Sequence, residues 1–329
     1  MQSLIKIVAT ALFGTLLGLV LAEGALRLFD WGDCQTFRTD EGYGYIMGAD
    51  QWVSTRGHRF YINHYGLRGP DFTPRRASGT DRIAFLGDSI TFAGGRIAEK
   101  DIFVTRAAAL IAADTRRQVE PVNVSAPGWG VQNMYAYVRT VGIHDADIVV
   151  WVLPSVDFRR PKTTVNDHDF PLSKPALRLS CLSRFVLKLL GNVMAEGRGN
   201  RDLIRSRVLA ENLSAFSEAL RKIKEDGATV GVVFLPSAHD NPQTAADLVA
   251  YRTTAERLNV PIFDLGPEFV KHNEKKLFYD GFHPGEQGHK LIAEQVAQFV
   301  ESFWKPDQTA AGVAEAHGPK SGHGDLDNH

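Results

Sequence analysis

The feature that most constrains the fold is a series of short apolar segments separated by amphipathic ones. Residues 146–154 read ADIVVWVLP and show no alternation of polar and apolar side chains after Asp147, which is typical of a strand buried on both faces. Similar runs occupy residues 82–87, 120–128, 228–236 and 261–265. Strands of this kind that alternate with helices predict a parallel sheet covered on both faces, in a three-layer α/β/α domain.

Helices are predicted between these strands. One begins near Asp101, and others cover residues 206–227, 244–259 and 286–304. In the helix over 206–227, apolar side chains recur at spacings of three and four and form one stripe, and Gly227 ends the helix. Right-handed crossovers place the carboxyl ends of the strands along one edge of the sheet, where ligand sites in such sheets lie.

The N-terminus carries a targeting signal. Lys6 is followed by an uncharged apolar run of sixteen residues, from Ile7 to Ala22. This length lies between a signal-peptide core of about 7–15 residues and a spanning helix of about 17–25. A cleavage site after Ala22 is an alternative, but we favour an uncleaved transmembrane anchor over residues 1–23, because Lys6 and Glu23 can reach toward the headgroups. In both cases the rest of the chain is expected to be exported.

The remaining chain divides into three parts. Residues 24–80 are expected to form an irregular, mostly extended lead-in, because glycine and proline interrupt every helical period. Within it, residues 61–69 read YINHYGLRG and either wrap the core or contact a sugar. Residues 81–304 form the main domain, with an insertion at about 157–205, and residues 305–329 are expected to be disordered because they contain few apolar side chains.

Composition argues against nucleic-acid binding and leaves open whether the chain forms a disulfide. The 329 residues carry a net charge of −1, so a nucleic-acid partner is not expected. The two cysteines, Cys34 and Cys181, could form one disulfide in an oxidising compartment, but their positions in the sequence do not show that they meet.

Three residues at the predicted ligand edge could carry out nucleophilic chemistry. Ser89 follows the strand over 82–87 almost directly, although Asp88 and Ser89 could simply cap the next segment. Asp280 and His283 lie three residues apart in a loop before the last helix. At that spacing the carboxylate can fix the imidazole tautomer and leave the other nitrogen to take a proton from a serine hydroxyl.

Acyl transfer also needs donors for the oxygen that becomes negatively charged. The backbone N–H of Ser89 is one candidate. A second is Gly128, in the glycine-rich turn APGWG that follows the strand over 120–128 and would lie at the same edge. The alternative for Gly128 is a simple turn glycine.

The motifs FLGDSIT, NVSAPGWG and DGFHPGEQGHKLIA resemble, in this order, the first, second and last sequence blocks of the SGNH (GDSL-type) hydrolases. The resemblance covers residues 82–304 and implies a flavodoxin-like parallel sheet. It also implies Ser89 as nucleophile, His283 as base, Asp280 as its orienting acid, and the N–H groups of Ser89 and Gly128 as the oxyanion hole. The lead-in NHYGLRG is similar to that of membrane-anchored bacterial members.

One position departs from the family pattern. The third block usually carries an Asn-Asp pair, and here Val156 precedes the matching Asp157. Valine cannot donate a hydrogen bond, so either Ser155 substitutes for the asparagine or the oxyanion hole has only two donors. The pair Asn166-Asp167 lies in the insertion and does not take over the role. Residues 167–169, Asp-His-Asp, are interpreted as a solvated loop rather than a metal site.

The sequence therefore predicts a membrane-anchored serine esterase that faces the periplasm or the cell exterior and holds no metal or organic cofactor. Its expected substrate is a short acyl ester on a cell-surface or exopolysaccharide glycan, by family resemblance and location. One alternative is an O-acyltransferase that uses the same triad and receives the acyl group from a membrane partner. Another is a catalytically silent glycan-binding domain, which the valine at position 156 would favour.

Overall fold

The computed structural model describes residues 2–55, 57–165, 171–184, 201–272 and 276–304. Its centre is a five-stranded sheet of order β6-β5-β7-β8-β9, in which every neighbouring pair is parallel. The strands are β5 (Thr80–Gly87), β6 (Gln118–Ser125), β7 (Ile148–Pro154), β8 (Thr229–Leu235) and β9 (Ile262–Asp264). All five apolar runs of the sequence thus form strands of one sheet, as predicted.

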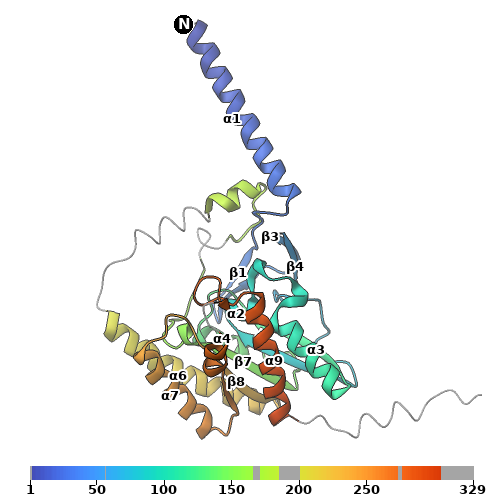
Figure 1. Cartoon of the computed structure of the whole chain (residues 1–329), viewed down its shortest axis with the longest axis vertical. Coiled ribbons are helices and arrows are strands. Elements are labelled where there is room, and N and C mark those ends of the chain that lie inside the picture. Colours follow the sequence, from blue (N-terminus) through green and yellow to red (C-terminus); the bar gives the residue numbers. More distant parts are fainter. Residues whose placement is uncertain (1, 56, 166–170, 185–200, 273–275, 305–329) are drawn as a thin grey trace, which may run out of the picture.

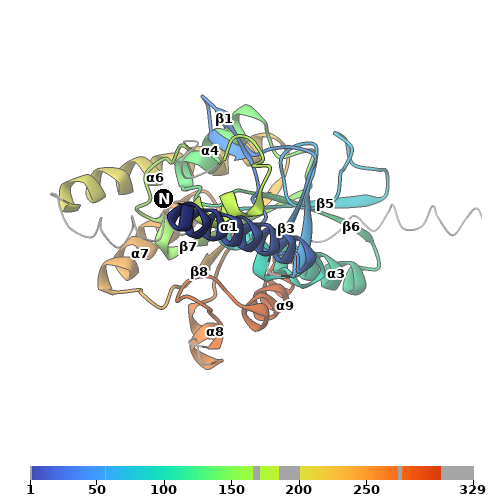
Figure 2. The same cartoon turned by 90° about the horizontal axis from the view of Figure 1, so that it is seen from above.

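Helices cover both faces of this sheet (Figures 1 and 2). One face carries α4 (Val131–Thr140), α6 (Arg201–Glu225) and α7 (Pro242–Arg257). The other carries α3 (Phe103–Thr115), α8 (Gly266–Lys271) and α9 (Glu286–Phe303). The molecule has the three-layer α/β/α architecture that the pattern predicts.

The apolar patterns account for how these layers pack. Every residue of β7 is buried, as expected for a central strand with a helix layer on each side. On α6, the last three residues of the stripe, Phe216, Leu220 and Ile223, are completely buried. Among the helices that cover the sheet, two were not predicted: α8 has only six residues, and α4 mixes polar and aromatic side chains, so neither shows a clear period.

The lead-in differs from the predicted irregular segment, because it contains two antiparallel hairpins. They are β1–β2 and β3–β4, with β1 (Phe37–Asp40), β2 (Gly44–Met47), β3 (Gln51–Thr55) and β4 (His58–Ile62). Their apolar side chains belong to the same core cluster as α4 and α6. Within YINHYGLRG, Leu67 and Arg68 are buried, and Arg68 bridges Ile62 and Asn123 of β6. This favours the wrapping role over the sugar-contacting one.

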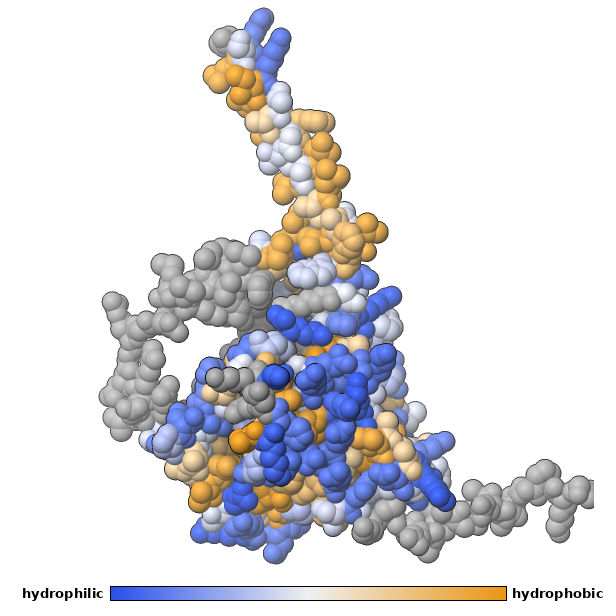
Figure 3. All heavy atoms as spheres, in the orientation of Figure 1, coloured by the Kyte–Doolittle hydropathy of each residue, from blue (hydrophilic) through white to orange (hydrophobic). Residues whose placement is uncertain are grey.

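Outside the body of the molecule stands α1 (Gln2–Leu28), which is apolar, has no buried residue, and is long enough to cross a membrane (Figure 3). It extends five residues beyond the boundary expected at residue 23. Residues 178–184 are helical and lie against its base, and Cys34 and Cys181 form a disulfide there. The cysteine question that the sequence left open is thus answered in favour of a bond.

Three short 3-10 turns complete the described elements: η1 (Gly94–Arg96), η2 (Glu99–Asp101) and η3 (Ser155–Asp157). Several predicted features lie outside the described residues. They are the Asn166-Asp167 pair, the 167–169 loop and the tail over 305–329.

Candidate active site

Ser89 lies two residues after the end of β5, at the carboxyl edge of the sheet. Ser89 is the first residue of α2 (Ser89–Phe92), and the Asp88 side chain caps that helix by accepting from the N–H of Ile90 at 2.8 Å. A Cβ on Gly87 would overlap the Thr91 side chain. The tight passage from strand to helix therefore needs glycine at position 87 and fixes where the Ser89 hydroxyl points.

The loop before α9 brings His283 to this hydroxyl. The Nε2 atom of His283 lies 3.0 Å from Ser89 Oγ, and its Nδ1 atom lies 2.7 Å from Asp280 Oδ2. The other oxygen of Asp280 accepts from the backbone N–H of His283 at 2.8 Å. Two segments that are distant in the sequence thus form one continuous chain from hydroxyl to imidazole to carboxylate.

Aromatic rings hold the imidazole in place. The ring of Phe282 lies 4.2 Å from that of His283, and the ring of Tyr279 stacks on His283 at 5.6 Å, nearly parallel. Burial, followed by the Asp280 charge, raises the pKa of Tyr279 to about 12, so it stays neutral. Partial burial acts to raise the pKa of Asp280, but hydrogen bonds and the charge of His283 outweigh it and leave that pKa lowered. Asp280 is therefore a carboxylate at neutral pH.

Two backbone N–H groups at the same edge are free to bind an anion. Within the described part of the chain, neither Ser89 N nor Gly128 N donates to another protein group. Gly128 has a φ of +84°, and an added Cβ would lie 2.9 Å from the Tyr45 hydroxyl. The turn is held on both sides, because Tyr45 donates to Pro127 O at 2.7 Å and Thr163 donates to Gly128 O at 2.8 Å.

A buried charge cluster lies behind the nucleophile. Arg160 Nε is 2.9 Å from the Asp157 carboxylate, and Arg160 Nη1 is 3.6 Å from that of Asp88. Asp157 is completely buried, and its oxygens have no well-directed hydrogen bond among the described residues, despite the close guanidinium. Burial, and then the Asp88 charge, raise the pKa of Asp157 well above its usual range, although Arg160 opposes this.

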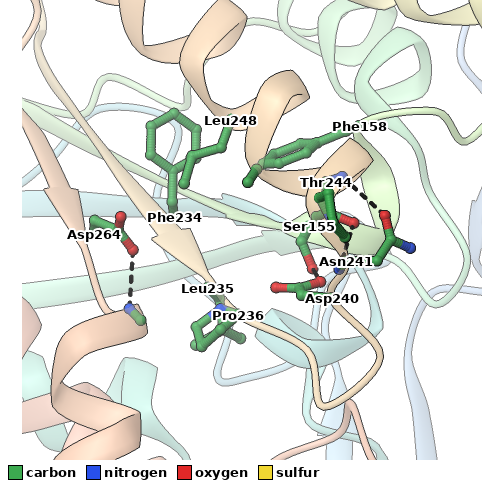
Figure 4. Close-up of a pocket in the computed structure, with 13 residues that line it drawn as sticks. Ser155, Phe158, Phe234, Leu235, Pro236, Asp240, Asn241, Thr244, Leu248 and Asp264 are labelled. Atoms are coloured by element: carbon green, nitrogen blue, oxygen red, sulfur yellow. Dashed lines mark hydrogen bonds between the residues drawn. The ribbon is translucent and has the colours of Figure 1, made fainter.

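Among the described residues, neither Ser155 nor Asp157 is hydrogen-bonded to Ser89. Ser155 donates to Asp240 at 2.5 Å and lines a pocket of about 330 Å³, together with Phe158, Phe234 and Leu248 (Figure 4). Val156 lines a groove with Arg159 and Asp247. Ser155 is thus a pocket residue whose hydroxyl proton is already used, and Asp157 is too deeply buried to meet a substrate.

Sequence reasoning missed several groups around the triad. Arg160 lies in the predicted insertion and carried no motif, and Arg96 is joined to the site only by the tertiary fold. Tyr279 directly precedes Asp280 in the chain, but its stacking on His283 is a property of the folded loop. No group of three or more His, Cys, Asp or Glu suited to a metal occurs within the residues that the structure describes.

The fold is that of the SGNH hydrolases. The chain belongs to the GDSL-like lipase/acylhydrolase family, whose model matches residues 85–291, and it is a hydrolase that acts on ester bonds. No curated protein sequence matches it.

Several solved structures are similar to this chain. The lipase/acylhydrolase from Enterococcus faecalis is 17% identical, with a TM-score of 0.44 over 69% of this chain and 99% of that one. The psychrotrophic esterase EstA from Pseudoalteromonas sp. is 11% identical, with a TM-score of 0.45 over 68% of this chain and 98% of that one. A two-domain esterase active on acetylated mannans is 15% identical, with a TM-score of 0.45 over 68% of this chain and 50% of that one.

Proposed function

We propose that the chain is a serine esterase in which Ser89, His283 and Asp280 form the catalytic triad. The observation that carries this proposal is the 3.0 Å contact of Ser89 Oγ with His283 Nε2, continued at 2.7 Å to Asp280. His283 takes the hydroxyl proton as Oγ bonds to the ester carbonyl carbon, and then gives it to the alcohol oxygen as the ester C–O bond breaks. Water repeats the sequence on the acyl-enzyme, releasing the carboxylic acid and restoring Ser89.

The negative charge that develops on the carbonyl oxygen would be held by the N–H groups of Ser89 and Gly128. Both belong to backbone that is fixed before substrate binds, so little reorganisation is needed during the reaction. The loss of one such donor costs about 3–4 kcal/mol in other enzymes. With valine at position 156 we expect a two-donor hole and a slower enzyme than one with three donors.

We further propose that the site faces the periplasm or cell exterior and acts on a short acyl ester of a surface glycan. The Cys34–Cys181 disulfide supports this location, because such bonds persist in oxidising compartments. The apolar helix α1, none of whose described residues is buried, supports retention at the inner membrane. The groups around the triad are mainly charged or aromatic, which suits a sugar better than a long aliphatic chain.

The proposal is tested by labelling the full chain with a fluorophosphonate and by following hydrolysis of p-nitrophenyl acetate. Wild type is expected to be labelled and to release p-nitrophenol, and Ser89→Ala is expected to lose both, with activity lower by about 10³-fold or more. Labelling that persists in Ser89→Ala, or wild type that does not react, would contradict the triad. Acetyl transfer to added glycan in preference to water would instead identify an acyltransferase.

A further inference from the structure

The loop over residues 93–96, which follows α2, is held in place by hydrogen bonds from Arg68. The completely buried guanidinium of Arg68 donates to Phe92 O at 2.9 Å and to Ile97 O at 3.0 Å, on either side of residues 93–96. It also donates to Gly94 O, and a Cβ on Gly95 would overlap the Thr55 side chain. The backbone that carries Arg96 is therefore fixed relative to Ser89.

The Arg96 side chain is fixed as well. Its guanidinium carbon lies 4.4 Å from the centre of the Tyr279 ring, a cation–π contact. Tyr279 in turn stacks on His283, whose Nε2 atom meets the Ser89 hydroxyl. One aromatic ring thus contacts both this guanidinium and the imidazole of the triad.

Arg96 is also an uncompensated charge. Its side chain is exposed, and within the described ranges no carboxylate lies at ion-pair distance from it. Three neighbouring guanidinium groups have carboxylate partners: Arg68 pairs with Glu99, Arg106 with Asp101, and Arg160 with Asp157. A cation held in one place beside a reactive site, with its N–H groups free, is suited to bind an anion.

The position of His283 indicates which part of a substrate would meet this charge. The imidazole must hand its proton to the alcohol oxygen of the ester, so the alcohol lies on the imidazole side of Ser89. Arg96 reaches the site on that side, through Tyr279.

We propose that Arg96 binds a negatively charged group, a carboxylate or a phosphate, on the alcohol portion of the ester substrate. This inference rests on the proposed esterase function and narrows it to acyl esters of anionic alcohols, such as an acylated acidic glycan. Arg96 would be a specificity-determining residue rather than part of the triad.

The test compares three acetyl esters with the same leaving-group ring: methyl 4-acetoxybenzoate, 4-acetoxybenzoate and 4-acetoxyphenyl phosphate. The measured quantity is kcat/KM for each anionic ester divided by that for the neutral one, after correction for their rates with hydroxide. In Arg96→Gln this ratio is expected to fall roughly 5- to 20-fold, as for the loss of a charge-assisted hydrogen bond. Arg96→Lys should give an intermediate ratio, because it keeps the charge but loses the planar fork.

The chain offers a matched control in Arg59, which is also exposed and lies 4.4 Å above an aromatic ring, that of Trp52. Arg59→Gln should leave the ratio unchanged. The preferred group, carboxylate or phosphate, is the one whose ester shows the larger fall of the kcat/KM ratio from wild type to Arg96→Gln. An identical ratio in wild type and Arg96→Gln would overturn the inference alone, whereas wild type inactive on all three esters would overturn the proposed function and this inference with it.

Discussion

At the scale of single residues, the charges behind Ser89 are the least expected feature of the site. Asp157 brings a carboxylate into a completely buried position, where it faces the Asp88 carboxylate and a single guanidinium, that of Arg160. Two negative charges share one positive charge, so ionisation of Asp157 opposes folding. The arrangement holds the ends of β5 and β7 together through Arg160.

The raised pKa of Asp157 predicts a particular pH dependence of stability. Because its pKa in the folded chain lies above the ordinary value of 3.8, its favourable contribution is complete below that pH and is lost as the pH rises. We expect Asp157→Asn to remove this loss. Its Tm, relative to that of wild type, should increase between pH 4 and pH 7, by about 3 °C or more.

Differential scanning fluorimetry across that pH range would measure the effect. A matched control is Asp247→Asn, because Asp247 is also buried but accepts hydrogen bonds from Arg159 and Gln243. This control should lower Tm at neutral pH. A Tm difference between Asp157→Asn and wild type that stays constant from pH 4 to pH 8 would refute the argument.

Single-residue chemistry was only partly visible in the sequence. Ser89, Asp280 and His283 could be selected because their types and the neighbouring strand and loop signals match acyl-transfer chemistry. Arg96 and Tyr279 could not, because an arginine and a tyrosine 183 positions apart meet only through the tertiary fold. Asp157 was selected from a motif, but its burial is a property of packing.

At the scale of elements, the base of α1 and the helix over 178–184 cap each other. The Glu23 carboxylate accepts the N–H groups of Arg178 and Leu179, each at 3.0 Å, at the start of the second helix. In the other direction, the Arg178 guanidinium donates to Leu26 O, near the end of α1, at 2.6 Å. Together with the disulfide, these bonds make the last turns of α1 part of the domain.

This mutual capping predicts the effect of removing the anionic cap. In Glu23→Gln, the amides of Arg178 and Leu179 should exchange with solvent faster, on the order of tenfold, because a neutral amide accepts more weakly than a carboxylate. Hydrogen-exchange mass spectrometry of the full chain in detergent would measure this. Glu211→Gln, which breaks an exposed ion pair with Arg207 within α6, is the control and should leave the exchange of residues 178–184 unchanged.

If exchange at these two amides is the same in Glu23→Gln and wild type, the two helices are not coupled through Glu23. The sequence could not reveal this junction, since Glu23 and Arg178 are separated by the lead-in and nearly half of the domain. It did predict the apolar helix itself, because sixteen consecutive apolar residues are a local signal.

At the scale of the whole molecule, two histidines link folding to pH. His289 is buried and His144 is half-buried; in each case loss of solvent contact, followed by a nearby arginine, lowers the pKa, to about 3 for His289 and about 4 for His144. Both are neutral in the folded chain and bind protons below about pH 6.5 only when it unfolds. The unfolded state therefore binds more protons in that range, and stability falls as the pH decreases from 6.5 toward 4.

The His289 contribution can be isolated by substitution. His289 Nδ1 accepts from Phe103 N at 3.2 Å, and the oxygen of an asparagine can take that bond without titrating. We expect His289→Asn to lower Tm at pH 7.5, because side-chain volume is lost, but to flatten the decline below pH 6.5. Between pH 6.5 and 4.5, the free energy of unfolding of His289→Asn should therefore fall by about 2–3 kcal/mol less than that of wild type.

Thermal unfolding at a series of pH values would show this change of slope. The exposed His272 provides the comparison, because His272→Asn should leave the slope as it is in wild type. Equal slopes for His289→Asn and wild type would contradict the linkage.

The sequence by itself determined the elements that depend on local patterns. Apolar runs specified the five strands, periodic stripes specified the long helices, and glycine-bounded motifs placed Ser89, Gly128 and the Asp280–His283 pair at one edge of the sheet. These signals are readable because strand burial, helix periodicity and turn chemistry act over a few residues.

Only the tertiary structure decided the contacts between distant segments. These contacts include the Cys34–Cys181 disulfide and the packing of the two lead-in hairpins against the core. They also include the hydrogen bond from Ser155 to Asp240 and the contact of Arg96 with the Tyr279 ring. Each of these contacts joins residues that share no local period or motif. The energy of each contact depends on how deeply packing buries its atoms and on which charges lie nearby. No local sequence pattern encodes that packing.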